Sequence, residues 1–462
     1  MGFQILIENL AIKHGGQKGD LIMATWKEYY KDHLVSMEDA AKSIKSGDNL
    51  WVGAATGVPY EFLDALYDLR DGLNNVRILY NVANTPFNML FHPESKKHFH
   101  IISHFTLPLE RASGEMGIAD FHSCPFEFIF RSVLDVYEAN TVAIRVCPPD
   151  EDGYCNSSIY GVNSSVKIAK DPRIKKKIGV IDRTQSPAGG IRDEIALHVT
   201  EFDYLIEFDS EPTYFPAAGP SPVDQKIAEY VTPFIHDGDK LQIGFGGLGD
   251  AVLSYIGSHL SDIEIFTEVA CESMVPLLKS GVAKHLTATS CGAGSQELYD
   301  ILGTDKCTIR DISMQIDPFL IGQQENLVAV NSTFMVDLTG QACSEAQGLK
   351  QYSAVGGAFG YLYGTIRSKG GRSLLCLRST YKDHEGNIHS NIVPWLPEGS
   401  IVTTPRYLAM YIISEYGVAD VFLRTIKERI KALIKIAHPD FRAELKEKII
   451  SVGMISEEDF DD

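Results

Sequence analysis

Long apolar runs are missing from this chain. No stretch approaches the roughly 20 consecutive apolar residues of a membrane-spanning helix, so we expect no membrane partner. Glu8 and Asn9 interrupt the short apolar patch near the N-terminus, and no basic region precedes it. This pattern argues against a signal peptide. Met23 opens a more convincing start, "MATWKEYY", which makes residues 1–22 a candidate extension.

Paired cysteine motifs are also missing. The eight cysteines are spread along the chain, and none forms a C-x-x-C pair. This spacing excludes a zinc ribbon and a disulfide framework, and it predicts reduced, mostly buried thiols in a cytoplasmic protein. His384 and His389 are spaced too loosely for a helical metal pair, with no cysteine nearby. We therefore expect no metal.

Basic residues are scarce relative to acidic ones. The chain has 42 Lys and Arg against 61 Asp and Glu, a net charge of −19. Such a charge disfavours nucleic acid as a partner. An anionic ligand would need basic residues gathered around it. Two places offer them, the run 171–179 and the pair Lys369 and Arg372 beside two glycines. Solvated surface charge is the alternative for both.

Helix and strand patterns alternate along the chain. A buried strand pattern at 49–52 runs into a Gly/Pro turn, and an amphipathic helix over 60–73 and a strand over 75–83 follow. The same order returns as a helix over 221–237, a strand over 240–244, a helix over 250–260 and a strand over 263–268. This alternation predicts an α/β fold with mostly parallel sheets. We also expect helical structure from Met23 to about Lys45, with an N-terminal cap signal at Ser36 and an end at Gly47, and a short strand over 400–405.

An internal repeat accompanies this alternation. The stretches "SGDNLWVG" (46–53) and "DGDKLQIG" (237–244) share Gly-Asp-x-Leu-x-x-Gly at an offset of 191 residues. We predict two related open α/β domains, 23–212 and 222–462, joined by the Pro- and Gly-rich segment "EPTYFPAAGPSP". Two related halves commonly place a site in the cleft between them, so we expect the active site there.

One charged residue, Glu268, lies at the end of a mostly apolar strand pattern. Glu268 follows Thr267 at the end of "IEIFTE", and glutamate is rarely buried without a partner. The upstream segment "IGFGGLGDAV" (243–252) is glycine-rich between a strand and a helix, where backbone N–H groups can approach a ligand. It is not a dinucleotide fingerprint, and a tight structural turn is the alternative. No G-x-S-x-G or P-loop occurs.

A carboxylate at a strand's carboxyl end can act as a nucleophile toward an activated acyl group. Parallel α/β sheets bind ligands at that edge. Attack by Glu268 would form a covalent intermediate, and the glycine-loop N–H groups would stabilise the oxyanion. These arguments permit acyl transfer without choosing a substrate.

Several stretches between about residue 24 and residue 450 follow the sequence pattern of a known family. They are "CPPDEDGYCN" (147–156), "GFGGLGDAVL" (244–253), "FTEV" (266–269), "NSTFMVDLTGQ" (331–341), "QYSAVGGAFG" (351–360), "SKGGRSLLCLRST" (368–380), "SNIVPWLPEGSIVTTPR" (390–406), "SEYGVAD" (414–420) and "IAHPDFRAEL" (436–445). In these stretches the chain resembles the acetyl-CoA hydrolase/transferase group of class I CoA-transferases, with the 4-hydroxybutyrate and butyrate CoA-transferases nearest.

The resemblance implies a reaction and a set of site residues. Glu268 matches the family's nucleophile, which implies ping-pong transfer of CoA from a short-chain acyl-CoA to a carboxylate such as acetate. The implied intermediates are an acyl-glutamyl anhydride and a glutamyl-CoA thioester. CoA is then a co-substrate, no cofactor is resident, and a homodimer or homotetramer is usual. The implied CoA and oxyanion residues are Gly244, Phe245, Gly246, Gly247, Asn331, Ser353, Gly356 and Gly357.

The chain departs from the family pattern at a few positions. Phe266 stands where relatives often have His, and Ala358 where they often have Gln, which indicates a less polar acyl pocket. Leu248-Gly249 replaces the usual Ile-Pro. Two alternatives to a transferase remain open, an acyl-CoA hydrolase in which water intercepts the glutamyl intermediate, and a non-catalytic CoA-binding paralogue. The acyl group and the role of Glu415 are not assigned.

Overall fold

A computed structural model describes residues 18–210, 219–291 and 294–460, without the side chains of 18–25 and 159–163. The described chain forms two compact units. The first comprises residues up to Ser103, Pro108–His122 and Phe130–Thr213. The second comprises His104–Leu107, Ser123–Ile129 and the chain from Tyr214 onward. The predicted linker, 211–222, lies mostly outside the described residues.

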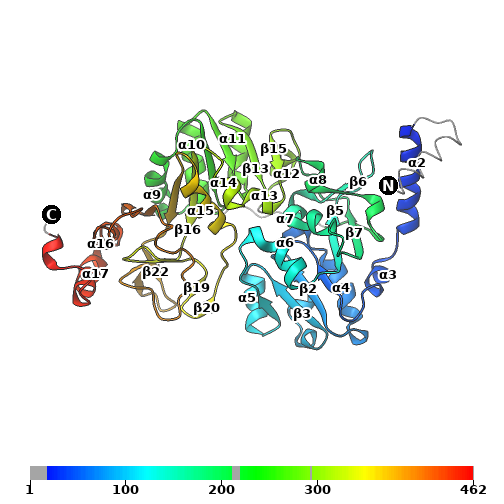
Figure 1. Cartoon of the computed structure of the whole chain (residues 1–462), viewed down its shortest axis with the longest axis horizontal. Helices are drawn as coiled ribbons and strands as arrows, with labels where there is room; N and C mark the ends of the chain where they lie inside the picture. Colours follow the sequence, from blue (N-terminus) through cyan, green and yellow to red (C-terminus); the bar gives the residue numbers. More distant parts are fainter. Residues whose placement is uncertain (1–17, 211–218, 292–293, 461–462) are drawn as a thin grey trace. The chain divides into compact units, whose positions relative to one another are not determined.

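The first unit contains a seven-stranded sheet in which every neighbouring pair is parallel (Figure 1). Its order is β4-β3-β2-β1-β5-β7-β9. The strands are β1 (Asn49–Trp51), β2 (Val76–Tyr80), β3 (Phe99–Ser103), β4 (Ala119–Phe121), β5 (Thr141–Val146), β7 (Lys176–Asp182) and β9 (Tyr204–Phe208).

The second unit contains an eight-stranded sheet of order β15-β13-β11-β10-β16-β21-β25-β26. It is parallel except for the last pair. The strands are β10 (Asp239–Ile243), β11 (Ile263–Phe266), β13 (Ala283–Ala288), β15 (Cys307–Ile309), β16 (Leu327–Ser332), β21 (Arg372–Cys376), β25 (Tyr411–Ser414) and β26 (Gly417–Asp420). The predicted mostly parallel α/β fold is confirmed.

Helices and small strands complete the two units. The helices are α2 (Lys18–His33), α3 (Met37–Lys42), α4 (Tyr60–Asp68), α5 (Pro108–Glu115), α6 (Ile129–Arg131), α7 (Ser158–Ala169), α8 (Arg192–Ile195), α9 (Pro222–Val231), α10 (Gly247–His259), α11 (Val275–Ser280), α12 (Gln296–Leu302), α13 (Ile312–Gln315), α14 (Pro318–Ile321), α15 (Ala358–Arg367), α16 (Ile426–Ile436) and α17 (Pro439–Ser451). The small strands are β6 (Tyr154–Asn156), β8 (Ala196–His198), β12 (Val269–Ala270), β14 (Ser290–Cys291), β17 (Met335–Asp337), β18 (Ala342–Cys343), β19 (Ala346–Gln347), β20 (Lys350–Gln351), β22 (Thr380–Lys382), β23 (Ile388–Ser390) and β24 (Ile392–Val393).

The two large sheets share one topology. In order of appearance along the chain, the strands of each unit are arranged 4-3-2-1-5-6-7, and the second unit adds β26 at the edge. The short sequence repeat therefore corresponds to a repeat of the whole sheet. In both sheets the strand order reverses between the first and the fifth strand, which is where open α/β sheets bind ligands.

The repeated Gly-Asp dipeptide has the same structural role in both units. Gly47 and Gly238 adopt φ of +86° and +85°, a left-handed turn that favours glycine. The following aspartates each pair with a cation at the start of the sixth strand. Asp48 lies 3.1 Å from Lys176, and Asp239 lies 2.5 Å from Arg372. The dipeptide thus fixes the amino end of the first strand against the sixth.

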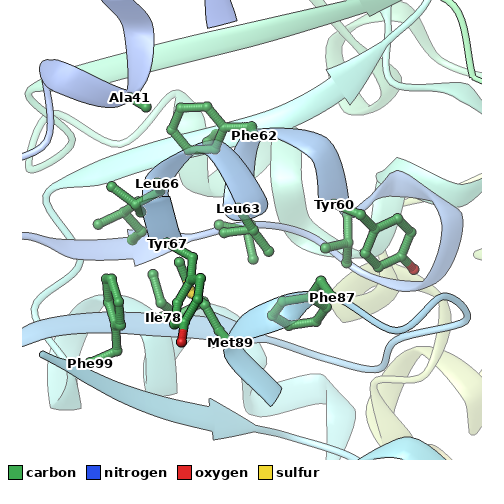
Figure 2. Packing of buried hydrophobic residues seen from close by; sticks show 14 of the residues in the cluster. Ala41, Tyr60, Phe62, Leu63, Leu66, Tyr67, Ile78, Phe87, Met89 and Phe99 are labelled. Carbon is green, nitrogen blue, oxygen red and sulfur yellow. The ribbon is translucent and has the colours of Figure 1, made fainter. Parts of the chain in front are cut away.

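Figure 2 shows how the sheet of the first unit is covered. Helix α4 presents Leu63, Leu66 and Tyr67 toward Ile78 on β2 and the neighbouring Phe87, Met89 and Phe99, while Phe62 lies on the side of Ala41 in α3. The helical spacing of these residues in the sequence explains why one face of α4 is buried. A separate core in the second unit packs α16 and α17 on β25 and β26.

One local expectation is confirmed and one was wrong. In the segment 23–45, Ser36 adopts an extended conformation (φ −70°, ψ 155°) and caps α3 by accepting a hydrogen bond from the Asp39 N–H, as the cap signal predicts. Residues 400–405 form no strand. Only Thr404 makes a single bridge, to Ala342, and the next residue, Pro405, has no N–H to continue the pairing.

Candidate active site

The carboxyl ends of three neighbouring strands of the second unit bring the predicted site residues together. Strands β11, β10 and β16 are adjacent and parallel, so they end at one edge of the sheet. Glu268 follows β11, and the glycine loop Gly244–Gly247 follows β10. Asn331 is the next-to-last residue of β16. The loop and Asn331 flank the point where the strand order reverses.

The backbone around Glu268 is held on both sides. Thr267 is fully buried, and its Oγ1 donates to the carbonyl of Ile243, the last residue before the glycine loop, at 2.8 Å. The Glu268 carbonyl accepts hydrogen bonds from the N–H and Oγ1 of Thr289, both at 2.9 Å. These bonds fix the strand end from which the Glu268 side chain projects, relative to the glycine loop.

The Glu268 carboxyl group lies against the Gly356–Gly357 turn. It is half-buried and accepts a hydrogen bond from the Gly357 N–H. A Cβ at Gly357 would overlap the Glu268 Oε2, so only glycine permits this approach. Burial raises the pKa of Glu268 to about 7, the Glu127 carboxylate adds to the rise, and the Gly357 hydrogen bond opposes it. A carboxylate in this state is a better nucleophile than an exposed one.

The glycine loop presents backbone to solvent at the start of a helix. Gly244, Phe245 and Gly246 are exposed, and the Phe245 side chain is 65% accessible. Gly246 adopts φ +117°, ψ 176° as the N-cap of α10, which begins at Gly247. The first N–H groups of an α-helix lack partners within the helix and attract anions. The loop can therefore accept a phosphate or an oxyanion.

The other predicted residues have identifiable partners. The Asn331 Nδ2 donates to the Gln242 Oε1 at 3.1 Å, which links β16 to β10. The Ser353 N–H donates to the Glu345 carbonyl at 2.9 Å, and no hydrogen bond joins Ser353 to Glu268 among the described residues. The Gly356 carbonyl accepts from the Phe126 N–H at 3.1 Å.

Three residues of this site were missed in the sequence. The segment Phe126–Phe128 (helix η5) brings Glu127 close enough to Glu268 to raise its pKa. Tyr361 on α15 is buried, and its pKa is raised by burial first and by Glu268 second. The Gln315 Nε2 donates to the Thr267 carbonyl at 3.3 Å. Glu127 had a usable signal, a glutamate within the apolar stretch "PFEFIF", like Glu268.

Cations of both candidate anion sites pair with acidic residues. Arg372 forms an ion pair with Asp239 at the amino edge of the sheet, which is the edge opposite the one that carries Glu268. Lys369 forms an ion pair with Glu325 on the surface. In the run 171–179, Arg173 pairs with Asp135 and Lys176 with Asp48. These cations have structural partners within their own units.

All eight cysteines are free and buried, as predicted. No group of three or more His, Cys, Asp or Glu suited to a metal ion occurs in the described part of the chain. Among the same residues, every helix is too short or too polar to cross a bilayer.

Known proteins resemble the chain along most of its length. Residues 294–449 match the model of the acetyl-CoA hydrolase/transferase C-terminal domain. The succinyl-CoA:cyclohexane-1-carboxylate CoA transferase of Geobacter metallireducens is 32% identical over 434 residues, which cover 92% of this chain and 96% of the relative. The chain belongs to the acetyl-CoA hydrolase/transferase family. It is a CoA-transferase.

A second relative and a solved structure are also similar to the chain over most of its length. The butyryl-CoA:acetate CoA-transferase of Anaerostipes caccae is 30% identical, with 91% of this chain and 96% of that protein covered. The crystal structure of RipA from Yersinia pestis superposes with a TM-score of 0.84 at 27% identity, covering 93% of this chain and all of RipA. The family resemblance inferred from the sequence motifs is confirmed.

Proposed function

We propose that this CoA-transferase moves CoA between a short-chain acyl-CoA and a carboxylate such as acetate, with Glu268 as the covalent nucleophile. The observation that supports the proposal is the placement of Glu268. Its carboxyl group lies at the carboxyl edge of the sheet, beside an exposed glycine loop, with a pKa raised to about 7 by burial. Relatives named for transfer between butyryl-CoA and acetate support the short acyl group.

In the first half-reaction, the ionised Glu268 attacks the thioester carbonyl of the acyl-CoA. The C–S bond breaks, CoA leaves as a thiolate, and an acyl-glutamyl anhydride remains. The thiolate then attacks the glutamyl carbonyl. This step releases the first carboxylate and leaves a glutamyl-CoA thioester.

The second half-reaction reverses these steps with a new acid. The incoming carboxylate attacks the thioester, the thiolate leaves, and the thiolate then attacks the new acyl carbonyl. The products are a new acyl-CoA and free Glu268. Every nucleophile is already an anion, so the sequence needs no net proton transfer.

The glycine loop and its neighbours would stabilise the charge that develops. Each attack creates a tetrahedral oxyanion, which preorganised N–H donors stabilise. In this proposal the backbone of Gly244–Gly247 and the Asn331 amide supply these donors. Ser353 and Gly356 would contact CoA, and Gly357 would hold Glu268 in its reactive position.

Chemical trapping tests this proposal. The protein is incubated with butyryl-CoA or acetyl-CoA, treated with borohydride, digested, and analysed by peptide mass spectrometry. Borohydride reduces a glutamyl thioester to the alcohol. We expect the peptide containing Glu268 to exchange one carboxyl oxygen for two hydrogens, only when acyl-CoA was present. Glu268→Gln should show no modification and no transfer.

Omitting acetate separates transfer from hydrolysis. A transferase should consume little butyryl-CoA until acetate is added, and it should then form acetyl-CoA without accumulating free CoA. Unmodified Glu268 together with turnover in Glu268→Gln would exclude the nucleophile assignment. Acetate-independent release of CoA at the full rate would instead indicate a hydrolase.

A further inference from the structure

A second carboxylate shares the Glu268 site. Glu127 lies in η5 (Phe126–Phe128), which is joined to the site through the hydrogen bond from the Phe126 N–H to the Gly356 carbonyl. The next residue of that turn, Gly357, is the donor to Glu268. Glu127 and Glu268 are therefore attached to the same two-glycine turn.

The Glu127 carboxylate is buried without a partner. The residue is 8% exposed, and neither carboxylate oxygen accepts a hydrogen bond from another described residue; the one donor that lowers its pKa is its own backbone N–H. Buried carboxylates are normally paired or hydrogen-bonded, because desolvation of the charge is costly. An unpartnered carboxylate beside a catalytic nucleophile is therefore a candidate for binding a group of the substrate.

The surroundings of Glu127 are acidic. Burial raises the pKa of Glu127 to about 7, and the charge of Asp317, the N-cap of α14, adds to the rise. Glu127 in turn raises the pKa of Glu268. No basic side chain among the described residues contributes to either shift. The site thus repels a further negative charge and would gain from a donor or a cation.

The acyl chain of the substrate passes through this region if Glu268 is the nucleophile. In the proposed anhydride the acyl carbonyl carbon is bonded to a Glu268 oxygen. The Gly356–Gly357 turn links the two carboxylates, because the Phe126 N–H donates to the Gly356 carbonyl at 3.1 Å and the Gly357 N–H donates to Glu268, so a chain of three or four carbons on Glu268 extends into the region of Glu127. Groups at the far end of a short acyl chain can therefore reach the Glu127 carboxylate.

We propose that Glu127 determines the acyl specificity of this enzyme. It accepts a hydrogen bond from a donor on the acyl chain, an ammonium in preference to a hydroxyl, and it rejects acids that carry a second carboxylate. This inference rests on the proposed function, since it requires the acyl chain to be attached at Glu268.

A series of acids that differ in one terminal group tests the proposal. The acids X–CH2–CH2–COO⁻ with X as ammonium, hydroxyl, methyl and carboxylate are β-alanine, 3-hydroxypropionate, butyrate and succinate. Each competes with butyrate for CoA from acetyl-CoA, and the product ratio gives the ratio of kcat/KM values. The ratio does not depend on the concentration of active enzyme. We expect the order β-alanine, 3-hydroxypropionate, butyrate, succinate.

Two substitutions separate charge from hydrogen bonding. Glu127→Gln keeps the shape and an acceptor oxygen but removes the charge. We expect the β-alanine-to-butyrate ratio to fall about 30-fold, the succinate-to-butyrate ratio to rise by a similar factor, and the 3-hydroxypropionate ratio to change less than about threefold. Glu127→Leu also removes the acceptor, so the 3-hydroxypropionate ratio should fall as well.

The control is Glu345→Gln, which makes the same chemical change at another buried glutamate of the second unit. Glu345 is 5% exposed, and burial raises its pKa. The product ratios measured with Glu345→Gln should match those of the wild type. Ratios unchanged in Glu127→Gln, or a wild type that uses succinate as readily as β-alanine, would overturn the proposal. Turnover that persists in Glu268→Gln would instead overturn the nucleophile assignment.

Discussion

The two units have the same sheet but differ at the carboxyl ends of its strands. Leu50 pairs with Ile78 in the first unit as Leu241 pairs with Ile265 in the second. Counting three residues on from each partner reaches Asn81 and Glu268. Asn81 is 2% exposed, and its N–H donates to the Gly53 carbonyl at 3.0 Å. The equivalent of the nucleophile is thus a buried structural residue.

The loops that follow the first strand of each sheet also differ, because one is mostly buried and the other is exposed. In the first unit, Gly53 and Ala54 are buried, and the Ala55 N–H donates to the Val82 carbonyl at 2.7 Å. In the second unit, Gly244, Phe245 and Gly246 are exposed. A single scaffold therefore supports a closed packing junction in one unit and an open loop beside a carboxylate in the other. The sheet topology alone does not specify the chemistry.

The largest expected difference comes from substituting these equivalent positions. Glu268→Gln should lower kcat for CoA transfer by at least about 10³-fold, because the amide is not a nucleophile. Asn81→Asp should leave the kcat of the folded enzyme unchanged. It should lower the free energy of unfolding by about 3 kcal/mol, since it buries an unpaired charge. Steady-state kinetics and urea denaturation of both variants measure the contrast. Comparable losses of kcat would show that the units are not specialised.

The next effect concerns the glycine that contacts the nucleophile. Gly357→Ala places a Cβ where the Glu268 Oε2 lies, so Glu268 must move. We expect kcat to fall by about 10²-fold. Gly257→Ala is the control, because its Cβ would meet the nearest atom, on Leu277, at an ordinary 3.7 Å. That variant should gain about 0.5–1 kcal/mol of stability from helix propensity and keep its activity. A fully active Gly357→Ala would contradict the described contact.

The third effect depends on pH. The reaction needs ionised Glu268, and the pKa of this group is raised to about 7. The value of kcat/KM for transfer should therefore be constant above pH 8 and fall about tenfold per pH unit well below 7. Glu127 and Glu268 influence each other, so the profile reports the pair. Glu127→Gln removes the like charge and should shift the midpoint downward. A flat profile down to pH 5.5 would contradict a buried carboxylate nucleophile.

The smallest effects concern the ion pair that the repeated Gly-Asp dipeptide forms in each unit. Asp239→Asn breaks the pair with Arg372, and Asp48→Asn breaks the pair with Lys176. The Asp239 side chain is 6% exposed and that of Asp48 is 16% exposed. We expect losses of about 2–4 kcal/mol and about 1–2 kcal/mol in the free energy of unfolding, because a more buried unpaired partner costs more. Kinetic constants of the folded variants should not change, since both aspartates lie at the amino edge. Equal losses would contradict this argument.

Much of the scaffold could be predicted from the sequence. The alternation of strands and helices and the Gly-Asp repeat gave the parallel sheets, because both depend on local patterns. Glu268 stood out for a related reason, as a charged residue in an apolar strand. The N-terminal cap at Ser36 was predicted for the same reason, since its signal lies in the residues that directly follow it.

The partners of Glu268 could not be predicted in the same way. Glu127 precedes Glu268 by 141 residues and Gly357 follows it by 89, so only the tertiary fold brings them together. The segments His104–Leu107 and Ser123–Ile129 belong to the second unit although they interrupt the first. No local pattern in the sequence indicates that these two segments belong to the second unit. The charge on Glu127 was visible in the sequence, but its neighbours were not.

The burial of every cysteine affects how hydrolysis can be distinguished from transfer. Burial raises the pKa of the Cys147 thiol to about 12 and that of Cys271 to about 11, and it raises the pKa of Cys376 further. Thiolates are the reactive form, so the folded chain offers little competition for electrophiles at neutral pH. It should neither take acyl groups from a thioester by side reactions nor form mixed disulfides with released CoA. A thiol-reactive dye added to the native enzyme should therefore react with free CoA alone, so its signal reports hydrolysis and not transfer.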